Sequence, residues 1–254
     1  AEKRTDQPLG SSEDIRSIDR KTLIEFYQQW YSPQMATVVV VGDVDPVSIE
    51  KKIKEMFASI PRKKVKGYRV YPLTYEKGIA LHEIGDDLKR SSELELIIPH
   101  PCVVGNTVGT IYHKELGSLL VRAITNRLQA RQIRSNVSDA WFLSDKNHFV
   151  FTFSGTDKSG LLQQVSDLSN ELECILKNGF TPEELDDAIK ELSRTLKVDC
   201  SAQLSGKWCD DFVDYVISGD RYIQSEKEMR QLLEKIRSTD SATLQKLLQE
   251  WLSY

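Results

Sequence analysis

The feature that most limits the possible fold is one strand-like run, Met35–Val41. The run is apolar and rich in β-branched valines up to Gly42, which is typical of a central strand buried on both faces. Predicted helices flank it, one with Asp19 as its N-cap and the other starting at Asp45. A single strand cannot form a sheet. We therefore expect partner strands upstream or in another chain, and we expect this N-terminal unit to be incomplete.

A second unit is predicted from Gly78 onward. Its strands are expected at Ile79–Ile84, Glu93–Ile98, Asp139–Leu143 and Asn147–Phe153. The last strand alternates phenylalanines, so one of its faces should be aromatic core. A long helix is predicted over residues 107–134, and a capping box of Thr181 and Glu184 starts a later one. The order of strand pairs and helices indicates an α+β fold, a mainly antiparallel sheet with helices packed on one face.

These patterns divide the chain into three parts. Residues 1–61 form the closing portion of one domain, residues 62–77 form a linker, and residues 78–254 form a second domain. The linker assignment depends on its basic and then Tyr/Pro-rich composition, which shows no helical or strand period.

Charge and hydropathy argue against two classes of partner. The formal net charge is −4, whereas nucleic-acid binders usually carry a basic domain or stripe. The one basic run, Arg62–Lys66, is interpreted as a solvated connector. No apolar run approaches the ~20 residues that a membrane span needs. The sequence therefore predicts neither nucleic-acid binding nor a membrane span.

The four cysteines lie far apart and form no C-x-x-C motif. Free or buried thiols are the favoured interpretation of Cys102, Cys174, Cys200 and Cys209. A single Cys200–Cys209 disulfide stays open as the alternative.

The histidines show no metal-binding pattern. Zinc sites often place two histidines one helical turn apart, and no two of His82, His100, His113 and His148 are so close. His113 and Glu115, two residues apart on a helix, should point in different directions. His82 and His148 lie in predicted strands and are interpreted as structural. We assign no catalytic and no metal-ligating residue to this chain.

Three arginines, Arg127, Arg131 and Arg134, fall on one face of the predicted long helix. Such a group could hold a carboxylate or a chain terminus. Solvated arginines with local ion pairs are the favoured interpretation.

Several motifs carry a family resemblance. Phe26–Pro33 reads FYQQWYSP, Val38–Pro46 reads VVVVGDVDP, and Phe57–Pro61 reads FASIP. Together they resemble the closing part of the catalytic domain of pitrilysin/insulinase-type zinc metallopeptidases. Gly179–Leu185, which reads GFTPEEL, resembles a helix start in the second domain of that family.

The resemblance implies that residues 1–61 close a catalytic-type domain and that residues 78–254 form a non-catalytic pitrilysin-like domain without its last strand. The inverted zinc motif His-x-x-Glu-His of the family is absent from this chain and is expected upstream. Zinc is therefore expected in the parent protein and not in this chain, which should be inactive alone. In the family, an arginine and a tyrosine help to hold the substrate. Residues 127–141 contain no tyrosine that would match this pair, so we assign neither role to this chain.

By the same resemblance, the parent protein would degrade or process peptides in a closed chamber. Its expected partners are peptide substrates, the upstream catalytic half and a second pitrilysin-like half. The alternatives are a zinc-less partner or structural subunit that binds without cleaving, and a stand-alone peptide-binding module. A periplasmic or cell-envelope location is favoured over the cytoplasm.

Overall fold

The chain forms two units, Ala1–Arg69 (unit 1) and Val70–Tyr254 (unit 2). The computed structural model describes residues 11–62, 78–83, 85, 91–105, 107–143, 146–155, 157–201, 205–219, 223 and 225–253. Apart from Arg62, the predicted linker lies outside the described residues. Each unit is described by itself.

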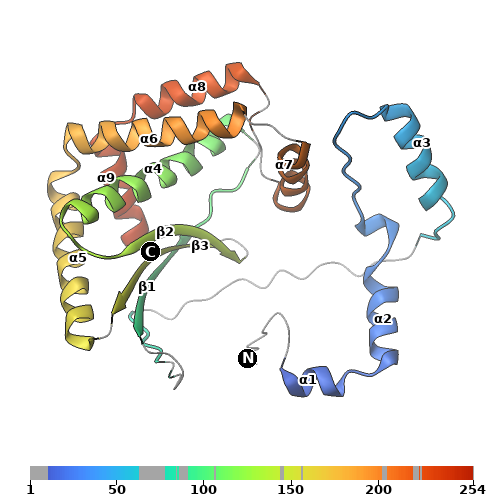
Figure 1. Cartoon of the computed structure of the whole chain (residues 1–254), viewed down its shortest axis with the longest axis horizontal. Helices are drawn as coiled ribbons and strands as arrows, with labels where there is room; N and C mark the ends of the chain where they lie inside the picture. The colour runs from blue at the N-terminus through green and yellow to red at the C-terminus, as the bar shows by residue number, and fades with distance from the viewer. Residues whose placement is uncertain are drawn as a thin grey trace. The chain divides into compact units, whose positions relative to one another are not determined.

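Unit 1 consists of short helices joined by irregular segments (Figure 1). The elements are α1 (Ser12–Ser17), α2 (Arg20–Trp30), the 3₁₀ turn η1 (Pro33–Met35) and α3 (Pro46–Phe57). The carboxylate of Asp19 accepts the amide hydrogen of Thr22 at 2.7 Å, and Asp45 caps α3 through Ser48 at 3.0 Å. The caps predicted for these two helices are confirmed.

The predicted strand Met35–Val41 is wrong for this chain. Met35 ends η1, and residues 36–41 form no strand. Val38 and Val40 are 48% and 46% exposed, so the run is not buried on both faces. The physical reason is that a strand requires a neighbour to accept its backbone hydrogen bonds, and the described residues of unit 1 provide none.

Unit 2 is built around a three-stranded antiparallel sheet of order β1-β3-β2. Its elements are β1 (Ser92–Pro101), α4 (Val108–Ala130), β2 (Asn136–Leu143), β3 (Lys146–Gly155), α5 (Lys158–Asn178), α6 (Pro182–Ser201), α7 (Ser205–Ser218), α8 (Glu226–Arg237) and α9 (Ser241–Leu252). The register places Phe151 opposite both Leu96 and Val137. The predicted α+β class with an antiparallel sheet is confirmed.

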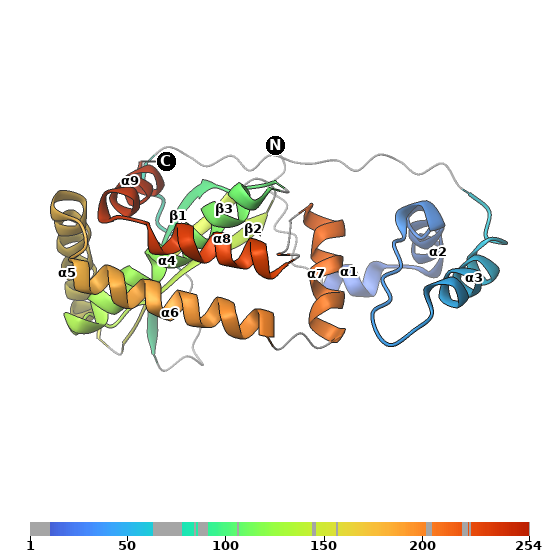
Figure 2. The same cartoon turned by 90° about the horizontal axis from the view of Figure 1, so that it is seen from above.

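Helices α4, α5 and α9 of unit 2 pack against the sheet and cover one of its faces. In Figure 1, α4 lies between the sheet and the pair α6 and α8, which run side by side in Figure 2. The covered face carries the alternating phenylalanines, and the apolar stripe of α4 packs against it; these residues are fully buried: Phe149, Phe151, Phe153, Leu119, Leu120, Ala123 and Ile124. On the opposite face Glu93, Glu95 and Ile97 are exposed. The core therefore lies on the helix side of β3.

Two sequence predictions in unit 2 need correction. Residues 79–83 form no strand, and Ile79 and Leu81 are 100% and 90% exposed, because no described strand pairs with them. Ile84, the last residue of that predicted strand, lies outside the described residues. The long helix ends at Ala130, four residues early, where Gln132 adopts a positive φ of 60° that a helix cannot continue through.

Candidate functional site

A polar cluster occupies one end of the covered sheet face, where His100, Asp139 and Asn147 come from three different strands. His100 and Asn147 are directly opposite each other in the register, and Asp139 lies opposite Phe149, two residues further along β3. The ring Nε2 of His100 lies 2.9 Å from Asp139 Oδ1, and Asn147 Nδ2 donates to Asp139 Oδ2 at 3.1 Å. His100 is only 2% exposed. The cluster thus links both edge strands across β3.

Trp251 of α9 closes this cluster from the helix side. Its indole stacks on the His100 ring with centroids 4.1 Å apart and packs edge-on against Phe149 at 5.0 Å. A β-carbon on Gly117 of α4 would lie 3.2 Å from the indole, so a glycine there leaves room for the ring. The second ring nitrogen of His100 faces the Pro101 carbonyl oxygen at 3.2 Å. Both nitrogens are therefore engaged within the protein, which suits a positioning role better than ligation.

His148 follows Asn147 on β3 and points to the opposite face of the sheet. Partial burial lowers the pKa of His148, and the nearby His100 lowers it further, whereas Asp139 acts to raise it. The neutral imidazole is therefore favoured there.

A buried ion-pair network surrounds Arg127. Its Nε donates to Glu184 Oε1 at 2.8 Å, and its Nη1 donates to the Gly179 carbonyl at 3.2 Å. The guanidinium lies over the Phe180 ring at 5.5 Å, and the Arg127 side chain is 6% exposed. Glu184 also accepts the Thr181 amide at 2.9 Å, which confirms the predicted capping box. The network ties α4 to the start of α6.

The interpretation of Arg127, Arg131 and Arg134 as solvated arginines on one helix face needs two corrections. Arg127 is not solvated but pairs with Glu184 inside the protein, while the exposed Arg131 lies 3.5 Å from Glu171. Arg134 lies beyond the end of α4, so the three arginines do not share one helix face. The group is not arranged to hold an external carboxylate.

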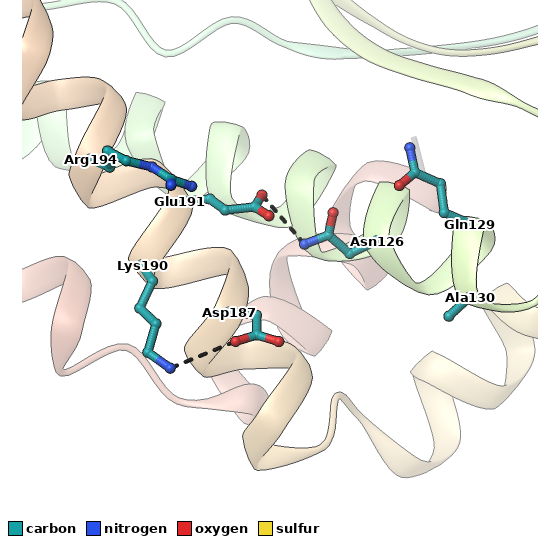
Figure 3. Close-up of a pocket in the computed structure, with 7 residues that line it drawn as sticks. All are labelled: Asn126, Gln129, Ala130, Asp187, Lys190, Glu191 and Arg194. Atoms are coloured by element: carbon teal, nitrogen blue, oxygen red, sulfur yellow. Dashed lines mark hydrogen bonds and ion pairs between the residues drawn. The ribbon is translucent and has the colours of Figure 1, made fainter.

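One surface hollow of about 710 Å³ lies between α4 and α6 (Figure 3). Its lining residues are Asn126, Gln129, Ala130, Asp187, Lys190, Glu191 and Arg194. Asn126 points toward Glu191 and donates to it at 3.4 Å, and Lys190 faces Asp187 at 3.7 Å. The lining offers amides and paired charges but no thiol, hydroxyl or imidazole. It is suited to polar surface contact rather than to covalent chemistry.

The histidines do not converge on a metal site. His113 is exposed on the first turns of α4, and His82 is exposed outside any strand, so its predicted strand environment is wrong. Within the described part of the chain, no three His, Cys, Asp or Glu side chains are grouped to hold a metal ion. Cys174 and Cys209 carry free thiols in this structure, whereas the side chain of Cys200 lies outside the described residues, so the Cys200–Cys209 disulfide stays a prediction. None of the described helices combines the length and apolar character that a membrane crossing requires.

The fold and these clusters define an α+β domain whose buried polar groups hold its own layers together. The chain belongs to the family described as the peptidase M16 inactive domain, whose model matches residues 17–192, across parts of both units. This confirms the resemblance to pitrilysin/insulinase-type metallopeptidases.

Relatives support the same assignment. The chain is 25% identical over 240 residues to a probable zinc protease, PqqL, of Escherichia coli; the match covers 92% of this chain and 24% of the relative. It superposes on the crystal structure of that periplasmic protease with a TM-score of 0.82 at 22% identity, covering 97% of this chain and 28% of the other. Against the crystal structure of the first half of PqqL, the TM-score is again 0.82 at 24% identity, with coverages of 97% and 55%. The chain thus spans about a quarter of the relatives' length.

Proposed function

We propose that this chain is the non-catalytic portion of a zinc-dependent metalloendopeptidase and forms one wall of a closed chamber that holds peptides. The observation that carries this proposal is the match to an inactive domain of the peptidase M16 family over residues 17–192. The structural similarity to the first half of PqqL supports an arrangement in which catalytic residues come from another part of the same protein. Residues 1–61 would close the catalytic-type domain, and residues 78–254 would form the adjoining one.

The side chains that the structure describes do not fit a zinc centre. His100, the most buried histidine, is engaged by Asp139 and Pro101, and His148 points to the other face of the sheet. Among the described residues, His113 belongs to no group of three side chains that could hold a metal ion. We therefore assign zinc, and the general base that would activate a water molecule, to the upstream half of the parent protein. No catalytic step is assigned to these residues.

The contribution of this chain would be to hold substrate. Among the described residues, the outer edges of β1 and β2 have no strand partner. An extended peptide can add to such an edge through backbone hydrogen bonds. On β1 the usable edge ends near Ile98, because Pro99 and Pro101 have no N–H to donate. β2 contains no proline.

The parent protein would act in the periplasm or the cell envelope. Support comes from the E. coli relative PqqL, whose crystal structure is described as that of a periplasmic protease. The second pitrilysin-like half would be the other wall of the chamber.

The first experiment measures zinc content and cleavage of a quenched fluorogenic peptide by the purified chain, with and without a chelator. We expect no bound zinc and no chelator-sensitive cleavage. About one tightly bound zinc per chain together with chelator-sensitive hydrolysis would overturn the proposal.

The holding role is tested with ¹⁵N-labelled chain and an extended apolar peptide. The matched control is the same peptide with alternate backbone nitrogens methylated, which cannot complete a strand ladder. We expect amide shifts confined to β1 or β2, and only with the unmethylated peptide. Equal shifts with both peptides would exclude strand addition. Binding without cleavage by a parent protein that lacks zinc would instead support the partner-subunit alternative.

A further inference from the structure

Two arginines at the hollow between α4 and α6 have no close partner among the described residues. Arg122 of α4 meets Glu191 only through Nη1 at 3.7 Å, and its Nε is buried without a hydrogen-bond partner there. Arg194 of α6 is exposed and forms no hydrogen bond or ion pair with another described residue. Because each guanidinium carries five N–H donors, most donors of this pair are unused.

The two arginines lie near the same carboxylate. Arg194 follows Glu191 by three residues on α6, and residues with this spacing share a helix face. In Figure 3 the guanidinium of Arg194 is turned toward Glu191, yet the two side chains form no ion pair. Asn126 donates to the same carboxylate, but only at 3.4 Å. One carboxylate therefore lies near two arginines and an amide without a short hydrogen bond to any of them.

Uncharged hydrogen-bonding groups continue from Arg122 along α4. Arg122, Asn126 and Gln129 are four and three residues apart, so they share one face of the helix. The side-chain amide of Gln129 has no partner within the described part of the chain. From Arg122 to Ala130 this face extends ~12 Å along the helix axis, the length of about four residues of extended chain. Side-chain amides can bond to both the N–H and the C=O groups of a peptide backbone.

The charge around the hollow favours a ligand with one negative charge. Four charged residues line the hollow, two of each sign, and they cancel: Asp187, Lys190, Glu191 and Arg194. Arg122, beside the lining, adds one positive charge. Asp187 is paired with Lys190 at 3.7 Å, so the two arginines have only Glu191 near them. A dianion such as phosphate fits less well than a carboxylate, because the two acidic residues repel it more strongly.

We propose that the hollow between α4 and α6 (the α4–α6 groove) binds a short extended peptide through one carboxylate, which Arg122 and Arg194 hold. The planar fork of a guanidinium matches a carboxylate with two parallel hydrogen bonds. Asn126 and Gln129 bond to the peptide backbone beside that carboxylate. The carboxylate belongs to an acidic side chain or to the C-terminus of the peptide, because both offer the same chemistry.

This site is separate from the strand edges that are proposed to hold substrate. All lining residues of the α4–α6 groove belong to the two helices, and none lies on β1 or β2. The inference therefore does not depend on strand addition, nor on whether the parent protein cleaves peptides.

Three pentapeptides test the groove on the full ¹⁵N-labelled chain. Acetyl-Gly-Gly-Asp-Gly-Gly-amide carries a side-chain carboxylate, acetyl-pentaglycine with a free C-terminus carries a terminal one, and the neutral control has asparagine in place of aspartate. We expect an acidic peptide to shift the arginine Nε and Asn126 amide signals with a dissociation constant of about 1 mM, weakening as salt is added. Which of the two acidic peptides binds identifies the source of the carboxylate. No shift with either acid at ~10 mM, or equal shifts with the neutral control, would overturn the proposal.

Two substitutions identify the groups that hold the carboxylate. Arg194→Ala removes a bidentate, charge-assisted partner and should weaken binding about fivefold to tenfold. The control Arg230→Ala removes another exposed arginine, on α8 and outside the groove, and should change binding by less than about twofold. Equal effects of these two variants would overturn the proposal.

Glu191→Gln tests the sign of the ligand charge. This substitution removes the carboxylate that competes for both arginines and keeps an oxygen that can accept from Asn126. Binding of the acidic peptide should therefore become at least about threefold tighter. Weaker binding in Glu191→Gln would overturn the proposal, since a groove that binds cations behaves in that way.

Discussion

Units 1 and 2 both contain amphipathic helices with aspartate caps, but only the helices of unit 2 pack against a sheet among the described residues. Helices α2 and α3 have aspartate caps, as α9 does, yet no residue in either is buried. In unit 2 the same kind of helix covers a sheet, and α4 buries its whole apolar stripe. Capping and periodicity therefore determine where a helix begins and ends, whereas burial requires a partner layer.

The largest expected difference between the units comes from core truncation. Phe151→Ala removes a fully buried ring at the centre of β3 and should cost unit 2 about 3–5 kcal/mol. The matched Phe26→Ala in unit 1, at a side chain 56% exposed, should cost less than about 0.5 kcal/mol. Urea denaturation of both variants measures the two values. Similar losses would mean that unit 1 has a core of its own in solution.

The next effect concerns the buried arginine. Arg127→Ala leaves Glu184 and Glu171 without their shared cation and should destabilise unit 2 by roughly 2 kcal/mol, less than for a fully buried pair because both carboxylates retain some contact with water. The control is Arg131→Ala, which removes an exposed arginine from Glu171 and should change stability by less than about 0.5 kcal/mol. If the two variants have the same melting temperature, the burial of Arg127 does not contribute to stability.

The smallest expected effect concerns the aspartate N-caps of α2 and α9, which are Asp19 and Asp240. Hydrogen bonds from Thr243 lower the pKa of Asp240, and those from Thr22 lower the pKa of Asp19. The stabilisation is therefore present above the unfolded-state pKa of ~3.9 and is lost as pH falls through the lower folded-state pKa. Asp240→Ala should lower the melting temperature of unit 2 by roughly 2 °C at neutral pH and by nothing in strong acid.

Asp19→Ala should leave the melting of unit 2 unchanged and reduce only the helical circular dichroism of unit 1. Thermal scans of both cap variants across the acid range check this pair. A shift of the unit 2 transition by Asp19→Ala would show that the two units unfold together.

Local signals in the sequence predicted the helices and their caps. The aspartates before α2 and α3 and the Thr181/Glu184 box act through neighbouring amides, so no distant residue is needed to find them. The strands predicted at Met35–Val41 and over residues 79–83 do not form, because a strand exists only beside a partner and local sequence does not show whether a partner is present. The strand predicted from the alternating phenylalanines is confirmed, because β3 has a partner strand on each side.

The polar clusters were harder to predict. His100 continues the alternation of Leu94, Leu96 and Ile98, which was a signal that it faces the core. Its partner Asp139 could not be identified without the register of β2 against β3. Arg127 follows Ala123 by one helical turn on the buried stripe of α4, but only the packing of α6 shows that Glu184 neutralises it.

The central position of β3 affects how the chain folds as it leaves the ribosome. β1 is synthesised first and has no partner until β3 emerges, whereas the β2–β3 hairpin can close in ~1–10 μs once made. Trp251 follows β3 by roughly a hundred residues, or ~5–20 s of synthesis. The nascent sheet therefore exists for seconds with His100 uncovered, and that end of the sheet is where we expect chaperones to engage the growing chain.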